Sequence, residues 1–245
     1  MGAKHKLEIL FEDDDIIIVH KPAHTLSIPD RFSPEKPNLL SLLKQRFEEV
    51  FVVHRLDKET SGVMCFAKNE AAHKHLSQQF ENRSVQKFYL TIVEGHPEPS
   101  EGVIEKPIAK HPHKGGQMTI HRSGKMAIST YEVLQKFKHF SLVKVHIKTG
   151  RTHQVRIHMK ALGHPLVVDT IYGKRPAFFL SEIKQRRYRL GKDQEERPLL
   201  SRSALHAHQL TIQHPTTSEA MTFEANMPKD MTAVLKQLEK WSSIL

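Results

Sequence analysis

The sequence contains a single cysteine, Cys65, among 245 residues. One thiol cannot close an intrachain disulfide, and it excludes zinc sites that are built from several thiolates. Cys65 also lies in the apolar run Val63-Met64-Cys65-Phe66-Ala67. Both facts fit a reducing compartment, and we expect the protein to be cytoplasmic.

Long apolar runs are lacking as well. No stretch approaches the roughly 18 apolar residues that a transmembrane helix requires. The N-terminal segment leads to the acidic group Asp13-Asp14-Asp15 and contains no apolar signal-peptide core. We therefore expect neither a membrane span nor a secretory leader.

Metal-binding motifs are also missing, although the chain has 18 histidines. No pair has the H-E-x-x-H arrangement of zinc proteases. His206 and His208 alternate along an expected strand, and His153 and His158 are not spaced as i, i+4 neighbours on a helix. No glycine-rich phosphate loop is present either. We expect no metal site.

Acidic residues are outnumbered, because 27 Asp and Glu stand against 37 Lys and Arg, a formal net charge of +10. This balance suits a polyanionic partner, RNA or DNA, better than an acidic small molecule. Hydrophobic residues make up 38% of the chain, which is enough for a sizeable core. The length allows one large domain or two small ones.

Two segments concentrate the positive charge. Residues 106–125 hold five Lys or Arg, among them Lys110, Lys114 and Arg122, and no Asp or Glu. We predict an extended basic hairpin or loop that contacts phosphates, with a solvated hairpin that binds nothing as the alternative. Residues 174–203 hold nine Lys or Arg against four acids, and we predict a surface excursion with a short helix.

Strands outnumber helices in the hydrophobic pattern, which predicts an α+β domain with a mainly antiparallel sheet. Asn38 and Asn69 are expected to be the N-caps of two helices. A third helix is expected over residues 152–162, with Arg156 away from its apolar stripe, and a last one over residues 228–244. Strands are expected over residues 7–11, 16–20, 87–93, 130–137, 140–148, 204–213 and 221–225.

One charged stretch lies between two apolar runs. His54-Arg55-Leu56-Asp57 follows Phe51-Val52-Val53 and precedes the run that begins at Val63. Both runs are typical of buried strands, so the charged turn is expected among core elements, where an ion is costly without a partner. The alternative is that Asp57 is a capping carboxylate beside a surface arginine.

These residues resemble the His-Arg-Leu-Asp motif of the RluA-type pseudouridine synthases. The stretches Asp15–Pro22, Lys148–His158 and Leu205-His206-Ala207 resemble the same family, in its order, and the resemblance runs from about Glu8 to about Met227. It implies the pseudouridine synthase fold: a long mixed, mainly antiparallel sheet around a central RNA-binding cleft, flanked by helices and loops. We expect residues 1–245 to form a single catalytic domain without an S4-type RNA-binding domain, and to act as a monomer.

The resemblance implies an isomerase that converts uridine in ribosomal or transfer RNA to pseudouridine without a cofactor. Asp57 would act as nucleophile or as base, Arg156 would be its cation, and Tyr89 would lie against the uracil. Arg55 would hold the place of the flipped-out nucleotide, and Leu205 would lie near the base. The basic loop and Arg151 would bind RNA, and His54 would be a supporting residue.

Two other functions remain open at this point. One is a non-catalytic RNA-binding protein that keeps the fold, and the other is a metal-dependent nuclease. Asp57, Tyr89 and Arg156 disfavour the first, because binding a polyanion does not require a buried carboxylate. The lack of clustered acidic and histidine ligands disfavours the second.

Overall fold

A computed structural model describes residues 7–191 and 194–244. The described chain forms two compact units, each with its own hydrophobic core. The first unit consists of the residues up to Phe88 and of His206–Asn226, and the second of Tyr89–Leu205 and the residues from Met227. That all these residues act as one catalytic domain stays a prediction.

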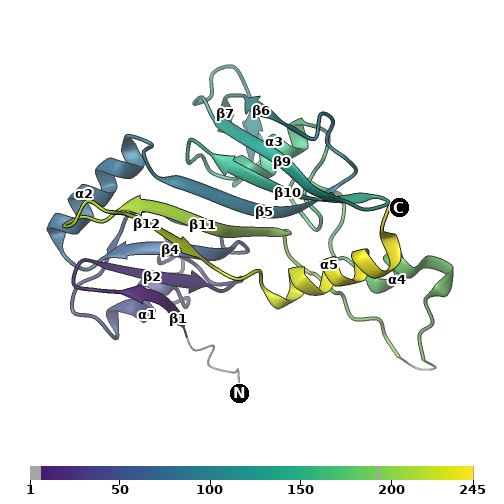
Figure 1. Ribbon diagram of the computed structural model, residues 1–245, viewed down its shortest axis with the longest axis horizontal. Helices are drawn as coiled ribbons and strands as arrows, with labels where there is room; N and C mark the ends of the chain where they lie inside the picture. The colour runs from purple at the N-terminus through teal and green to yellow at the C-terminus, as the bar shows by residue number, and fades with distance from the viewer. Residues whose placement is uncertain (1–6, 192–193, 245) are drawn as a thin grey trace. The chain divides into compact units, whose positions relative to one another are not determined.

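The strands of the first unit lie in the order β1, β2, β4, β11 and β12 (Figure 1). The short strand β3 pairs with β4. Every pair is antiparallel except β4 with β11, which is parallel, so the sheet is mixed as predicted. The bounds are β1 Glu8–Glu12, β2 Ile16–Lys21, β3 Phe51–Val52, β4 Ser61–Ala67, β11 Leu205–Gln213 and β12 Ala220–Glu224.

Two helices accompany these strands, α1 (Leu39–Lys44) and α2 (Glu70–Glu81). Both predicted N-caps are confirmed: the Asn38 side chain accepts a hydrogen bond from the Ser41 amide, and the Asn69 side chain accepts one from the Ala72 amide. Helix α2 buries its apolar stripe against the strands. The core of the unit includes Ile16, Ile18, Val63, Cys65, Leu76, Leu210 and Ile212.

The strands of the second unit lie in the order β5, β10, β9 and β6, and a separate pair, β7 with β8, forms a small hairpin. The pairs β10–β9, β9–β6 and β7–β8 are antiparallel. The bounds are β5 Gln86–Glu94, β6 Glu101–Glu105, β7 Ile108–Lys110, β8 Met118–Ile120, β9 Ile128–Lys136 and β10 Phe140–Ile147. The helices are α3 Gln154–Ala161, α4 Leu180–Lys184 and α5 Lys229–Ser242, with a 3-10 turn at Gln185–Arg187.

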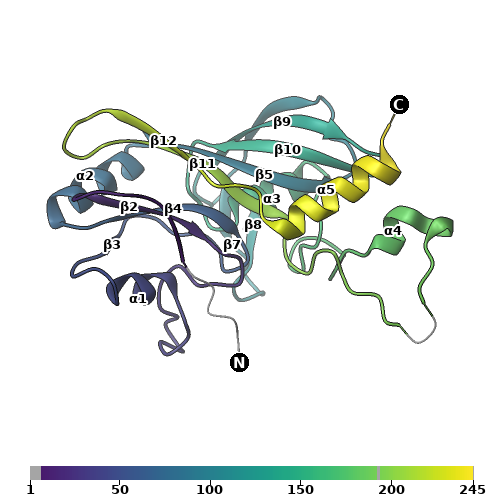
Figure 2. The same ribbon diagram turned by 60° about the horizontal axis from the view of Figure 1, so that its bottom comes forward.

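The basic excursion of residues 174–203 is only partly on the surface, so the prediction for it was incomplete. Figure 2 shows the segment around α4 standing out from the strands of its unit. However, Phe178 and Leu200 are buried in the core, and Arg202 is 1% exposed. The Arg202 guanidinium binds both oxygens of Asp230, at 2.6 and 2.9 Å, and this pairing makes its burial possible.

None of the described helices is long and apolar enough to span a membrane. Among the described residues, no three His, Cys, Asp or Glu side chains are grouped so that they could hold a metal ion.

Candidate active site

The loop that carries Asp57 is held in place by two buried side chains of the first unit. The Ser27 hydroxyl donates to the Leu56 carbonyl at 2.8 Å, and it accepts from the Leu56 amide at 3.1 Å. On the other side of Asp57, the Lys21 ammonium donates to the Lys58 carbonyl at 3.1 Å. The residues before and after Asp57 are therefore both fixed through their backbones.

The Lys21 ammonium also donates to the carbonyls of Pro22 and Thr25, at 3.1 and 2.7 Å. Lys21 is fully buried, and three carbonyl oxygens solvate its charge in place of water. It lies at the end of β2, in the opening segment that resembles the family. Sequence reasoning assigned no role to Lys21 or to Ser27.

Asp57 itself is less buried than the sequence suggested. Asp57 is partly exposed, and Arg55 is exposed. The preceding strand, β3, is only two residues long, and both are half-buried. The Asp57 carbonyl accepts the Thr60 amide at 3.1 Å, so Asp57 begins a turn and does not lie inside a strand. The turn therefore lies among core elements only in part: Leu56 and Thr60 are buried, and Asp57 is half-buried.

The glycine that follows the motif allows two strands to approach closely. Gly62 in β4 has a φ of +128°, and a Cβ at this position would lie 2.1 Å from the Ala207 carbonyl oxygen of β11. Next to it, the Ser61 hydroxyl is 3.0 Å from His206 Nδ1, and His206 Nε2 is 3.0 Å from the Ala225 carbonyl. Ser61 and Gly62, which follow the motif, are thus packed against His206 and Ala207.

His54 is a structural residue in this arrangement. Its Nε2 accepts the Cys65 amide at 3.0 Å, and its ring stacks on Phe80 at 4.7 Å. Burial, with a smaller contribution from the Lys87 charge, lowers the pKa of His54 to about 3. The imidazole is therefore neutral at pH 7, as an acceptor of that hydrogen bond must be.

Arg156 lies on α3, which is buried more completely than its predicted apolar stripe implied. All six residues from Gln154 to Met159 are buried. The polar ones are tolerated because they are paired: Gln154 Oε1 accepts from the Thr149 hydroxyl and from the Arg151 amide, at 2.7 and 3.0 Å. These bonds give the Thr149 and Gln154 side chains of the Lys148–His158 stretch a structural role, and Arg151 takes part through its backbone amide only.

The Arg156 guanidinium is held by Asp169, a residue that sequence reasoning missed. Arg156 Nε and Nη2 donate to the two carboxylate oxygens at 2.7 and 2.8 Å. Burial would raise the pKa of the Asp169 carboxyl, but the bonds and charge of Arg156 and two backbone N–H groups outweigh it and hold that pKa below its usual value. Asp169 therefore stays ionised and fixes the plane of the guanidinium.

Tyr89 and Leu205 lie on neighbouring backbone segments of the second unit. The Thr91 hydroxyl and the Ile92 amide of β5 both donate to the Ala204 carbonyl, at 2.7 and 3.2 Å. Leu205 follows directly, and both Tyr89 and Leu205 are largely buried, at 9% and 4% exposure. These two hydrogen bonds hold the segments together near Tyr89 and Leu205, while the roles of both residues toward a base stay predictions.

The basic segment of residues 106–125 forms a hairpin, as predicted. Strands β7 and β8 pair from Ile108 with Ile120 to Lys110 with Met118. Lys110, Lys114 and Arg122 are all exposed on it. We call residues 106–125 the basic hairpin. Arg151 lies next to its end, because its Nε donates to the Met126 carbonyl at 3.2 Å.

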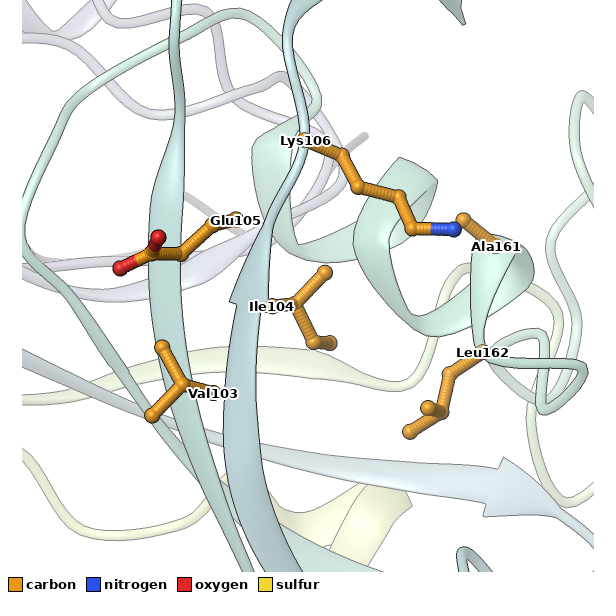
Figure 3. Close-up of a pocket in the computed structure, with 6 residues that line it drawn as sticks. All are labelled: Val103, Ile104, Glu105, Lys106, Ala161 and Leu162. Carbon is orange, nitrogen blue, oxygen red and sulfur yellow. The ribbon is translucent and has the colours of Figure 1, made fainter.

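A cavity of about 490 Å³ lies in the second unit beside β6 and the end of α3. Figure 3 shows Ile104 and Leu162 facing one another there, with the Lys106 side chain reaching toward Ala161. The lining is apolar except for Glu105 and Lys106, and it contains none of the candidate site residues. Lys106 is itself exposed, and its side chain extends along this cavity.

Comparison with known proteins gives consistent results. Residues 15–161 match the family described as RNA pseudouridylate synthase. The chain is 37% identical to a dual-specificity RNA pseudouridine synthase RluA of Escherichia coli O157:H7, over 89% of this chain and 92% of that protein. It is 34% identical to the ribosomal large subunit pseudouridine synthase D of Haemophilus ducreyi, over 95% of this chain and 71% of that protein.

A solved structure agrees with these sequence matches. The structure of human RNA pseudouridylate synthase domain containing 4 aligns with a TM-score of 0.72 and 25% identity, covering 95% of this chain and 93% of that chain. This confirms the predicted fold, and the predicted central cleft stays a prediction. The chain belongs to the RNA pseudouridylate synthase family and is an RNA pseudouridine synthase, an isomerase.

Proposed function

We propose that this enzyme isomerises uridine in ribosomal RNA, and that Asp57 is its catalytic carboxylate. The observation that carries the proposal is the anchoring of the Asp57 loop: Ser27 binds both backbone groups of Leu56, and buried Lys21 binds the Lys58 carbonyl. Two buried side chains that immobilise one short loop are more than a turn cap requires. They are what a catalytic group needs to be presented in one geometry.

In the proposed reaction the N1–C1′ bond of the target uridine breaks and a C5–C1′ bond forms. N1 ends with a proton, and the proton of C5 is released to solvent, so atoms and electrons balance without a cofactor. The ionised Asp57 carboxylate acts on the sugar, either by attack at C1′ or by removal of the C2′ proton. Both routes require Asp57 to carry its charge.

Arg156 is the proposed cation of this carboxylate. A guanidinium has three nitrogens and five donors, and the pair with Asp169 uses Nε and Nη2. Arg156 is therefore rigid before substrate arrives, and a rigid planar donor stabilises a carboxylate without reorganising during the reaction. Arg156→Lys should impair turnover, because a point charge does not replace the fork.

The remaining roles concern the RNA. Tyr89 would stack on the uracil, Leu205 would contact the same base, and Arg55 would fill the place of the flipped-out nucleotide. The exposed position of Arg55 and the burial of the other two side chains support this division. The basic hairpin and Arg151 would contact phosphates.

Ribosomal RNA is the substrate we favour because the Haemophilus ducreyi relative is named for the large ribosomal subunit. Transfer RNA is the second candidate, since another relative is named dual-specificity. The test is tritium release from 5-tritiated uridine in ribosomal and transfer RNA transcripts, with and without EDTA. We expect release from the ribosomal transcript that EDTA does not change. Release from transfer RNA alone would reassign the substrate, and loss with EDTA would contradict the proposed chemistry.

A further inference from the structure

The Tyr172 hydroxyl lies where α3 meets the basic hairpin. The Met118 amide of β8 donates to this hydroxyl at 2.8 Å, and His153 Nδ1, at the start of α3, is 2.7 Å from it. The Tyr172 ring lies under the Arg156 guanidinium, 5.0 Å from centroid to Cζ. One side chain therefore touches both the hairpin and the proposed catalytic arginine.

Asp169 ties the turn that carries Tyr172 to the same arginine. Its carboxylate receives both donors of Arg156, and Oδ1 also accepts the backbone amides of Ile171 and Tyr172, at 3.0 and 2.9 Å. A change in the direction of the guanidinium would thus disturb the turn, and a shift of the turn would disturb the guanidinium. Asp169 is fully buried, so water cannot easily replace these partners.

Apolar packing completes the connection. Tyr172 belongs to a small hydrophobic cluster that is separate from the main core of the unit. This small cluster joins the hairpin to α3. Among the described residues β7 and β8 pair as strands only with each other, and His158 Nε2 of α3 lies 3.3 Å from the Lys106 carbonyl at the start of the hairpin. The small cluster consists of Ile108, Ala127, Ile157 and Tyr172, with Met118, Ile120 and Ile171 packed against it.

We infer that Asp169 and Tyr172 are positioning residues with separate tasks: Asp169 orients Arg156 for the chemical step, and Tyr172 seats the basic hairpin for RNA binding. The inference rests on the proposed function, in which Arg156 acts at the carboxylate and the hairpin at the RNA. Because both residues belong to one short turn, the hairpin and the arginine are set by a common support. RNA that engages the hairpin then meets an arginine that is already aligned.

The two tasks predict different kinetic defects. Tyr172→Phe keeps the ring and its contact with the guanidinium but removes the hydroxyl that binds the Met118 amide. KM for RNA should rise about 5-fold, which is the loss of affinity expected from one missing hydrogen bond, and kcat should be unchanged. Asp169→Asn keeps the shape but removes the charge that holds Arg156, and kcat should fall about 100-fold with RNA affinity kept, as expected for a misplaced catalytic group.

Matched controls exist in the same unit. Tyr131→Phe removes another buried hydroxyl, which donates to the Pro99 carbonyl at 3.0 Å. Asp230→Asn weakens another bidentate pair, in which Arg202 is buried and the Asp230 side chain is 34% exposed. A general loss of folding would lower the melting temperature and the active fraction in all four variants alike. The inference requires that only the Tyr172 and Asp169 variants change KM or kcat, each in its own direction.

A double-mutant cycle separates this inference from the proposed function. In a Lys110→Ala, Lys114→Ala, Arg122→Ala background, Tyr172→Phe should weaken RNA binding no further, because the hairpin no longer contributes. If the triple variant and Arg156→Lys are impaired but Tyr172→Phe and Asp169→Asn behave like their controls, the inference fails and the proposed function stands. If the triple variant and Arg156→Lys are themselves unimpaired, the proposed function fails and the inference with it.

Discussion

The Ser27 hydroxyl bonds to both backbone groups of Leu56, at 2.8 Å to the carbonyl and 3.1 Å from the amide. Both residues are buried. One hydroxyl from the loop after β2 thus replaces the strand partner that Leu56 lacks. Because Asp57 is the next residue, this contact also fixes the position of its backbone.

Ser27→Ala should therefore impair catalysis and stability together. It leaves a buried amide and carbonyl without their partner, which costs about 1–3 kcal/mol of the free energy of unfolding. It also loosens the backbone before Asp57, so kcat should fall while RNA affinity is kept. Denaturant unfolding and single-turnover tritium release measure the two effects, and exposed Ser41→Ala is the control. A stable, fully active Ser27→Ala enzyme would show that the anchoring is unnecessary.

Replacing Lys110, Lys114 and Arg122 by Ala should weaken RNA binding and reduce its dependence on salt. Each lost phosphate contact lowers the slope of log K against log salt by about 0.7–0.9. The control removes the same charge elsewhere, with Lys74, Lys229 and Lys236 replaced by Ala. Equal slopes for the two triple variants would mean that the basic hairpin faces away from the RNA.

Gly62→Ala should destabilise the first unit strongly. The new Cβ would lie 2.1 Å from the Ala207 carbonyl oxygen, and the φ of +128° disfavours any L side chain. We expect a loss of at least about 3 kcal/mol or failure to fold, from the clash and the backbone strain combined. Gly115→Ala is the control, because nothing lies within 4 Å of its Cβ position. Thermal unfolding compares them, and similar stabilities would refute the close strand contact.

His54 should contribute a defined pH dependence to stability. Its pKa is about 3 in the folded protein and about 6.5 when unfolded, so below pH 6.5 the unfolded state binds one proton more. The contribution is full above pH 6.5 and is lost as the pH falls toward 3. Between pH 7.5 and 5.5 the wild type should lose about 1 kcal/mol more than His54→Gln. Urea unfolding at both pH values tests this. Equal losses of stability in the wild type and in His54→Gln would mean that the His54 ring is exposed to solvent.

Local signals predicted much of the fold. Both asparagine N-caps, the strands β1 and β2 and the basic hairpin were evident because each depends on residues close in sequence. The burial of α3 and Arg202 was not evident, because it depends on polar partners such as Asp230 that lie far away in the chain. Apolar periodicity reports apolar burial only.

The candidate site residues divide in the same way, into those that a local motif indicated and those that depend on distant partners. Asp57 and Arg156 were found through the motifs that contain them. Ser27, Asp169 and Tyr172 have no local motif; each acts on a residue at least 13 positions away, and only the folded chain brings the pairs together. Lys21 could have been noticed from the sequence. It is the last residue of the apolar strand β2, and a lysine is rarely buried unless its ammonium has hydrogen-bond partners.

The most direct test of the central claim is tritium release by Asp57→Asn, measured with RNA binding on the same preparation. Asn keeps the shape and most hydrogen bonds but removes the negative charge, and exposed Glu49→Gln is the matched control. We predict release at background with RNA affinity unchanged or slightly tighter, because a charge that repels phosphate is gone. A capping role would instead cost about 1 kcal/mol of stability and keep activity. Substantial release from folded Asp57→Asn would contradict the assignment of Asp57 as the catalytic carboxylate.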